Sequence, residues 1–481
     1  MSNVAQSLTP SLMQPLPFKK ILIANRGEIA VRVIRACHEL GIKTVAVHST
    51  ADNEALHVKL ASESVCIGPA LAKDSYLNIA SIMSAAIATR SDAIHPGYGF
   101  LSENAAFAEI CGSCGVTFIG PSVRNMRAMG DKARARRAAD KAGVPTIPGD
   151  SKGYMDPAEA VVVAKAAGFP ILLKACAGGG GRGMKIVENE ADFEKTFNTA
   201  QREVTAAFGD GHLLVEKYLR NVRHIEVQIA GDNFGNVIHL GIRDCSVQRR
   251  YQKIIEESPS KGLPEEMRQA IQDCAVDLAK SVGYTNVGTM EFLADLAAKK
   301  FYFIEMNTRL QVEHPVTELV TDTDLVKEQI RIAAGQELSL SQKDVKFSGH
   351  AIELRINAED PRTLVPSPGL INSYHPPGGN GVRVDSALYA GYRVQPYYDS
   401  LIAKLVCRAR TRDECIDKLL VALDEYIIDG INTNIELHRR ILRHPDFRSG
   451  NFHTKFLEGI NFFPEGDEWK QKTDTKKLTK A

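Results

Sequence analysis

The clearest candidate for chemistry is a set of five polar side chains at alternate positions: Glu305, Asn307, Arg309, Gln311 and Glu313. They follow the apolar residues 301–304, which are typical of a buried strand. In an extended chain alternate side chains share one face, so we expect these five to point the same way while the extended geometry lasts. Carboxylates, amides and a guanidinium suit a metal, phosphates and a small anion. The alternative is the solvated face of an edge strand, which the preceding apolar run disfavours.

A third carboxylate extends this candidate metal site. Glu291 lies in residues 288–293, which are predicted to form a mostly buried strand. Together with Glu305 and Asn307 it offers three hard oxygen ligands. Mg²⁺ favours a few carboxylates combined with substrate phosphates and water. The alternative is that Glu291 pairs with a buried arginine.

A dense glycine cluster, Gly178 to Gly181 followed by Gly183, lies between two predicted strands. Its bare backbone lets N–H groups approach phosphate oxygens, with Gly179, Gly180 and Gly181 at its centre. A dinucleotide-binding loop is disfavoured because residues 184–187 resemble a strand and not a helix. No Gly-Lys-Ser/Thr follows, so it is not a Walker A loop. A glycine hairpin over phosphates remains, with a flexible hairpin tip as the alternative.

Lysines and a basic run supply candidate anion contacts. Lys174 follows the apolar residues 169–173, where its ammonium must reach a polar partner or water. Lys132 is a second candidate for phosphate, although a lone lysine in a helix is usually solvated. Residues 243–253 are basic but contain glutamines and a tyrosine, which favours an ordered anion-binding segment over a solvated loop.

These residues need a scaffold, and the pattern predicts one with several parts. Strand, helix and strand at residues 19–24, 28–40 and 44–48 are βαβ alternation and predict a parallel, doubly wound sheet. Ligands bind at the carboxyl ends of such strands, so the loop at 95–104 is a site candidate. Residues 131–145 resemble a helical connector, and 146–218 a small α+β module. The rest mixes strands and helices, with a helix predicted at 411–423.

Composition is that of a globular protein of two to four domains: 481 residues, 44% hydrophobic and 24% charged, with net charge +1. This charge gives no reason to expect nucleic acid or an anionic membrane as a partner, and no apolar run approaches a membrane span. Nine scattered cysteines fit reduced cytosolic thiols, so we expect a cytoplasmic protein. The lone Cys111–Cys114 pair is interpreted as incidental. Residues 1–17 and 464–481 are expected to be flexible tails.

Four motifs then carry a resemblance to the biotin carboxylases of the ATP-grasp superfamily, and to the biotin carboxylase subunit of bacterial acetyl-CoA carboxylase, over about residues 18–461. They are Ile-Ala-Asn-Arg-Gly-Glu-Ile-Ala at 23–30, His-Pro-Gly-Tyr-Gly-Phe-Leu-Ser-Glu-Asn at 95–104, Glu305 through His314, and Pro-Tyr-Tyr-Asp-Ser at 396–400. The resemblance implies an N-terminal doubly wound domain (18–130), an ATP-grasp domain (131–345) with a mobile lid at about 146–218, and a mixed α/β C-terminal domain (346–463).

The resemblance also implies roles for individual residues. Nucleotide contacts are expected from Lys132, Lys174, His224 and Gln248, with Glu216 and Lys217 beside the adenine. Glu291 and Glu305 match the ligands of Mg²⁺ or Mn²⁺, with Asn307 beside them. The bicarbonate pocket is implied for Lys253, Arg309, Gln311, Val312 and Glu313. Arg355 matches the arginine at the biotin ureido oxygen, and Tyr98 and Asp399 lie near it.

The implied activity is ATP-dependent carboxylation of biotin with bicarbonate, through carboxyphosphate, as the first half-reaction of acetyl-CoA carboxylase. Glu313 is expected to act as general base. No biotin attachment segment is found in the sequence, so biotin is expected on a separate carrier protein, with separate carboxyltransferase subunits. A propionyl-CoA or pyruvate system, an ATP-grasp carboxylate–amine ligase and a pseudo-enzyme scaffold are the alternatives.

Three positions depart from the family pattern. Tyr251 replaces the usual histidine two places before Lys253, and Ala177 replaces the first glycine of the loop. Asn380 stands where an aromatic residue commonly contributes to a dimer face. None of these removes a residue with an essential chemical role, and a homodimer is expected.

Overall fold

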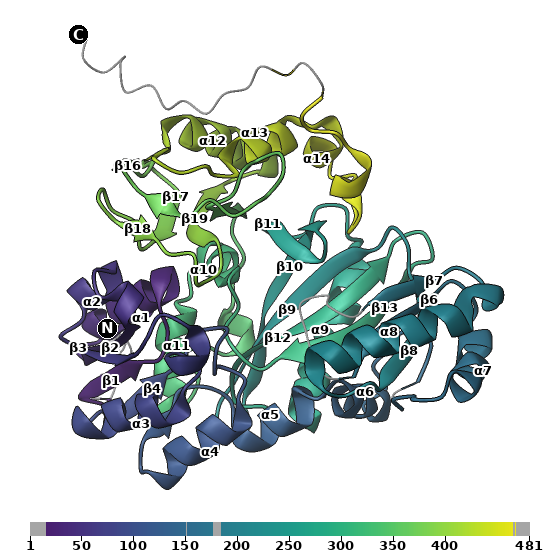
Figure 1. Ribbon diagram of the computed structural model, residues 1–481, viewed down its shortest axis with the longest axis horizontal. Helices are drawn as coiled ribbons and strands as arrows, with labels where there is room; N and C mark the ends of the chain where they lie inside the picture. The colour runs from purple at the N-terminus through teal and green to yellow at the C-terminus, as the bar shows by residue number, and fades with distance from the viewer. Residues whose placement is uncertain (1–15, 151, 177–183, 465–466, 468–481) are drawn as a thin grey trace, which may run out of the picture.

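The computed structural model describes residues 16–150, 152–176, 184–464 and 467. The predictions for Gly179, Gly180, Gly181 and Ala177, and those for most of the two tails, lie outside these residues. Figure 1 shows three regions: the purple N-terminal sheet, the blue to teal module of residues 152–176 and 184–217, and the green to yellow C-terminal part. They confirm the predicted fold class of a parallel-sheet domain joined to α+β and mixed α/β regions.

The N-terminal sheet is parallel throughout, in the order β3-β2-β1-β4-β5. Its strands are β1 (Lys20–Ile23), β2 (Lys43–Ser49), β3 (Glu63–Gly68), β4 (Ala93–His95) and β5 (Thr117–Phe118). Its helices are α1 (Gly27–Glu39), α2 (Leu56–Leu60), α3 (Ile79–Ala88) and α4 (Ala105–Ser113). The fifth strand is the shortest of them.

The loop after β4 is held by the residue that follows β1. The Asn25 amide donates to the carbonyls of Pro96 and Tyr98, both at 2.7 Å. Between them Gly97 has φ +62°, and a Cβ there would lie 2.9 Å from the Asn25 amide nitrogen. The close approach therefore requires glycine, and it fixes where Tyr98 is presented.

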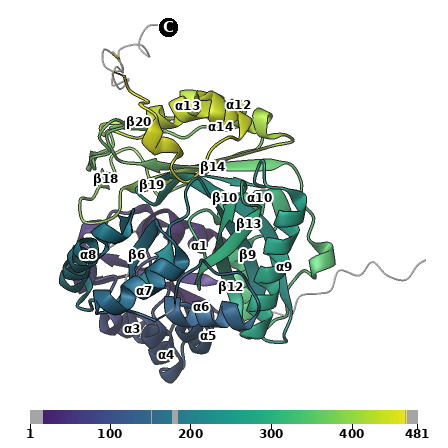
Figure 2. The same ribbon diagram turned by 90° about the vertical axis from the view of Figure 1, so that its right-hand side faces the viewer.

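Two helices, α5 (Val123–Met129) and α6 (Lys132–Lys141), lead to a module that forms its own small fold. Three antiparallel strands in the order β7-β6-β8 carry helices α7 and α8, which Figure 2 shows in front of the sheet. Their bounds are β6 (Ile171–Ala175), β7 (Lys185–Val187), β8 (Leu213–Lys217), α7 (Pro157–Ala167) and α8 (Phe193–Phe208). Phe193, Phe197 and Val215 belong to a core that this module does not share with the rest of the molecule.

The body is one antiparallel sheet of eight strands, in the order β13-β12-β9-β10-β11-β14-β19-β17. Its strands are β9 (Arg223–Gly231), β10 (Val237–Arg249), β11 (Gln252–Ser258), β12 (Asn286–Asp295), β13 (Lys300–Asn307), β14 (His350–Asn357), β17 (Val382–Ser386) and β19 (Leu401–Ala409). The pairing of β11 with β14 carries this sheet across the domain boundary predicted near residue 345. That division of the chain stays a prediction.

Helices and short strands complete the body and the C-terminal region. The helices are α9 (Glu265–Ser281), α10 (His314–Thr321), α11 (Leu325–Ala333), α12 (Arg412–Glu425), α13 (Ile435–Arg443) and α14 (Pro445–Ser449). The short strands are β15 (Gly369–Leu370), β16 (Ser373–His375), β18 (Arg393–Val394) and β20 (Ile427–Asp429). None of the helices in the described part of the chain has the length and apolarity needed to cross a membrane.

Candidate active site

A cavity of about 890 Å³ lies where the N-terminal sheet, the β6–β8 module and the body meet. Every predicted site residue within the described chain lines it: Tyr98, Lys132, Lys174, Glu216, Lys217, His224, Gln248, Lys253, Glu291, Glu305, Asn307, Arg309, Gln311, Val312, Glu313 and Arg355. Residues more than 250 positions apart in sequence are thus brought to one wall. Their individual roles stay predictions.

The ammonium group of Lys253 lies among three buried carboxylates. It contacts an oxygen of Glu226, and Oε1 of both Glu291 and Glu313 at 3.0 and 2.9 Å. The pKa of Lys253 is raised well above its ordinary value because the three negative charges outweigh the opposing effect of burial. Lys253 is therefore held as a permanent cation at the centre of the site.

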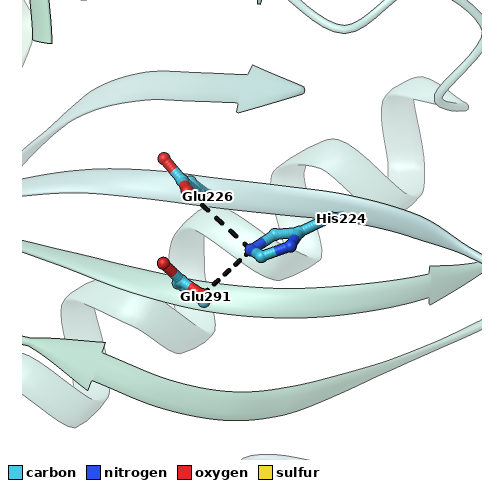
Figure 3. A group of neighbouring side chains, drawn as sticks. All are labelled: His224, Glu226 and Glu291. Carbon is cyan, nitrogen blue, oxygen red and sulfur yellow. Dashed lines mark ion pairs between the residues drawn. The ribbon is translucent and has the colours of Figure 1, made fainter. Parts of the chain in front are cut away.

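His224 closes one side of this cluster. Its Nε2 lies 2.9 Å from Glu291 Oε2 and 3.8 Å from Glu226 Oε1. Figure 3 draws both ion pairs. Burial alone would lower the pKa of His224, but the charge of Glu291 raises it. This histidine and the two glutamates have the ligand types of a metal site. Both carboxylates already accept from Lys253, so the group is better described as an ion cluster around a lysine.

Glu313 lies between two cations. Its Oε1 accepts from Lys253, and its Oε2 accepts from Arg355 Nη2 at 2.9 Å. Burial would raise the pKa of Glu313, but Lys253 and Arg355 hold it well below its usual range. The carboxylate is therefore ionised and able to accept a proton from a bound substrate.

Arg355 is itself oriented from behind by a buried acid. Its Nε donates to Glu256 Oε1 at 2.6 Å, while Nη2 reaches Glu313. Burial raises the pKa of Glu256 to about 7 despite the nearby arginine. A guanidinium fixed at both ends presents its remaining donors in a defined direction, which suits a developing oxyanion.

The extended alternation predicted from Glu305 to Glu313 is wrong beyond Asn307. Strand β13 ends there, and Glu313 is the N-cap of α10. Arg309, Gln311 and Glu313 still line the cavity, because the turn after β13 brings them back to it. Arg309 donates to Glu103 Oε2 and to Asn307 Oδ1, both at 2.9 Å. A carboxylate from the N-terminal domain thus orients the arginine expected to bind an anion.

The side of the cavity formed by the β6–β8 module carries its own ion pairs. Lys174 Nζ lies 2.5 Å from Glu216 Oε2, which supplies the polar partner that its position predicted. Glu216 also pairs with Arg136, at 3.5 Å. Lys217 Nζ donates to the carbonyls of Gly168 and Phe169 at 2.8 and 2.7 Å. Its ammonium therefore braces β8 against the loop before β6.

Comparison with known proteins identifies the family of the chain. The N-terminal domain family of biotin carboxylase matches residues 17–126, the ATP-binding domain of the carbamoyl-phosphate synthase L chain matches 131–341, and the C-terminal domain of biotin carboxylase matches 353–459. Biotin carboxylase 1 of Bacillus subtilis is 56% identical over 92% of this chain and 98% of its own. The Pseudomonas aeruginosa biotin carboxylase is 54% identical over the same shares.

The chain belongs to the biotin carboxylase family. It is an enzyme that couples cleavage of ATP to carboxylation of biotin. The β,γ-ATP complex of Campylobacter jejuni biotin carboxylase has a TM-score of 0.90 and 51% identity, covering 92% of this chain and 99% of that one. The biotin carboxylase domain dimer of Hydrogenobacter thermophilus 2-oxoglutarate carboxylase, with MgADP, ADP and bicarbonate, has a TM-score of 0.89 and 52% identity, covering 92% and 97%.

Two buried residues behind this biotin carboxylase site were not singled out from the sequence, although Arg243 begins the basic segment 243–253. Arg243 is fully buried and donates to Glu226, Gln228, Thr289, Thr317 and Gln311. Glu226 links it to Lys253. The sequence contained a signal for Glu226, because the polar residues 224, 226 and 228 alternate with apolar residues in β9. Such alternation is also typical of a half-exposed strand, and only the fold shows that both faces are covered.

Proposed function

We propose that Glu313 is the general base that activates bicarbonate, with Lys253 and Arg309 holding the anion and Arg355 stabilising the biotin enolate. The observation that carries this is the placement of one buried carboxylate between Lys253 and Arg355. Lys253 contacts one oxygen of Glu313, and Arg355, on β14, contacts the other. The proposed base therefore lies beside the lysine proposed to bind bicarbonate and beside the arginine proposed to bind the biotin enolate.

The residues then act in order. Glu313 accepts the proton of bicarbonate while a bicarbonate oxygen attacks the terminal phosphorus of ATP, giving carboxyphosphate and ADP. Carboxyphosphate separates into CO₂ and phosphate, and this phosphate takes the N1 proton of biotin. Arg355 stabilises the negative charge on the ureido oxygen until N1 attacks CO₂. The walls formed by the β6–β8 module exclude water that would hydrolyse carboxyphosphate.

Glu291 and Glu305 are suited to hold Mg²⁺ or Mn²⁺. They lie directly opposite each other on β12 and β13. Burial, together with the negative charge of Glu291, raises the pKa of Glu305, and a divalent cation would relieve this repulsion. The bound ion supplies neutralising charge to the phosphates. Asn307 fits less directly, because its Oδ1 accepts from Arg309 and its Nδ2 donates to Glu291.

The partners follow from this chemistry. We propose a biotin carrier protein, separate carboxyltransferase subunits, and a homodimer, as in the Hydrogenobacter domain dimer. Acetyl-CoA is the proposed final acceptor. Relatives with the same architecture are named as subunits of 2-oxoglutarate carboxylase and pyruvate carboxylase, so a keto-acid acceptor is the second candidate.

The test is release of ADP from ATP, measured with and without bicarbonate and free biotin. We expect a rate that requires bicarbonate and rises with biotin. A rate that depends instead on an amine and another carboxylate would indicate a carboxylate–amine ligase. ATP binding with no turnover under any of these conditions would indicate a pseudo-enzyme scaffold.

A further inference from the structure

A buried lysine outside the cavity contacts the backbone immediately before the proposed base. Lys404 on β19 is fully buried. Its Nζ donates to the Val312 carbonyl at 2.9 Å, and the next residue is Glu313. Lys404 does not line the cavity, although Val312 and Glu313 do. Any effect of Lys404 on the reaction must therefore pass through its neighbours.

The same ammonium joins three regions of the molecule. Its Nζ lies 3.2 Å from Glu28 Oε1, in the first turn of α1 in the N-terminal domain. It also lies 3.8 Å from Asp385 Oδ2, its cross-strand neighbour on β17. The Tyr98 hydroxyl donates to the same Glu28 oxygen. Through Glu28 and Lys404, the loop that presents Tyr98 is connected to the backbone that carries Glu313.

Charge keeps these contacts in place. Burial alone would lower the pKa of Lys404, but Glu28, Glu353 and Asp385 raise it. The ammonium is thus a permanent donor to Val312. Asp385 has a second cation, because Arg383 Nη2 donates to it at 2.7 Å. Glu28 depends more strongly on Lys404, and its Oε2 is buried without a hydrogen-bond partner among the described residues.

We infer that Lys404 is a positioning residue that fixes Glu313 by holding the Val312 carbonyl with its ammonium group. This inference rests on the proposed role of Glu313 as base. Its physical basis is that a base acts only within hydrogen-bond reach of the proton it takes, and that a displacement of about 1 Å can cost about a hundredfold in rate.

The first variant is Lys404→Met, which keeps much of the side-chain volume and removes the donor. We expect kcat for biotin-dependent ADP release to fall about a hundredfold, while KM for ATP changes by less than about threefold. The matched control is Arg412→Met. Arg412 is a buried cation in the same C-terminal region, paired with Glu257 at 2.7 Å, and it does not line the cavity. We expect the control to lower Tm while kcat stays within about threefold.

A double variant separates positioning from charge balance. Lys404→Met leaves the buried Glu28 carboxyl group without its cation, which destabilises the folded protein. Glu28→Gln combined with Lys404→Met removes that charge, so we expect Tm to recover and kcat to remain about a hundredfold low. Glu28→Gln alone retains the Lys404–Val312 bond, and we expect it to lose less than tenfold.

The outcomes distinguish this inference from the proposed function. Wild-type protein without bicarbonate- and biotin-dependent turnover would overturn the proposed function. With an active wild type, near-normal kcat in Lys404→Met or in the double variant would overturn the positioning role. If Glu28→Gln alone were as slow as the double variant, the loss of kcat would be due to Glu28 and not to Lys404. That result would also overturn the positioning role of Lys404.

Discussion

At the scale of single residues, the ionisation of Glu313 is controlled by two cations that also contact the reaction space. Lys253 and Arg355 outweigh the effect of burial and keep the pKa of Glu313 low. A low pKa makes the carboxylate available at any ordinary pH, but it also makes it a weak base. Its efficiency must then come from position, which explains why both of its oxygens are held by hydrogen bonds.

Glu313→Gln tests this residue directly. The amide keeps the shape of the side chain but cannot accept the proton, so we expect kcat for biotin-dependent ADP release to fall about a thousandfold. ATP affinity, measured by calorimetry, should stay within a few-fold. A variant that keeps most of its turnover would reject the assignment of Glu313 as base.

Glu305→Ala tests the metal assignment. It removes one hard oxygen ligand opposite Glu291, so we expect a several-fold higher Mg²⁺ concentration for half-maximal activity, with little change in Tm. Activity is titrated with Mg²⁺ at saturating ATP. An unchanged titration curve would contradict this placement.

Tyr251→His restores the usual family residue, and we expect activity within about tenfold of wild type, or roughly 1.4 kcal/mol of barrier. Tyr251 is half exposed, lines the cavity, and has φ +66° in the turn between β10 and β11. Histidine tolerates this left-handed backbone better than most residues, and it can also donate one hydrogen bond. Steady-state kinetics provide the measurement, and a loss beyond a hundredfold would show a specific role for Tyr251.

At the scale of elements, a buried ion cluster joins the strands that carry the site to the C-terminal helices. Glu257 on β11 accepts from Arg412 Nε, at the start of α12, at 2.7 Å. It also lies 3.3 Å from His350 Nε2 on β14. Burial would raise the pKa of Glu257, but Arg412 and His350 lower it to about 2. This carboxylate therefore stabilises the folded protein only while it is ionised.

The sign of the resulting pH dependence follows from that lowered pKa. The stabilisation by Glu257 is complete above its ordinary value of 4.5 and is lost as pH falls from there towards about 2. Between pH 4.5 and about 2 the wild-type protein therefore loses unfolding free energy through Glu257. We expect the Glu257→Gln variant to lose about 3 kcal/mol less than the wild type over this pH range. Denaturant unfolding at a series of pH values measures it. The control is Glu159→Gln, from an exposed pair with Lys152, and equal pH curves for all three proteins would refute the prediction.

At the scale of the whole molecule, the β6–β8 module has a core separate from the body and forms one side of the cavity. Lys174, Glu216 and Lys217 come from its strands, while Glu291, Glu305 and Glu313 come from the body. A ligand that bridges the two sets would couple the positions of two independently packed units.

We therefore expect a nonhydrolysable ATP analogue to slow hydrogen exchange in β6 and across Gly178 to Gly183, because backbone N–H groups gain phosphate partners. Helix α3, in the N-terminal domain, is the internal reference and should not change. Equal exchange with and without the analogue would reject a moving lid, and another element would then have to keep water from carboxyphosphate.

Local sequence was sufficient for the elements and for most of the candidate site. The βαβ pattern predicted the parallel sheet, and the predicted helix at 131–145 corresponds to α6. Glu291, Glu305 and Lys174 could be proposed because a charge beside an apolar strand is costly unless it has a function or a partner. Each of these charges lies within a few residues of the apolar run that makes it conspicuous, so no knowledge of the fold is needed to recognise it.

The tertiary structure alone decided which charges meet. Arg243, Glu256 and Lys404 are charged residues in buried strands, and their partners lie on other elements of the fold, as Val312 does for Lys404. A buried charge is stable only when a counter-charge reaches it, and that meeting depends on strand register and domain contact. The sequence by itself determined that candidates for a base, for anion-binding cations and for metal ligands are present. The pairing of β11 with β14, and the packing of α10 against both strands, decided that Glu313 is held between Lys253 and Arg355, because only that arrangement brings the three side chains within hydrogen-bond distance.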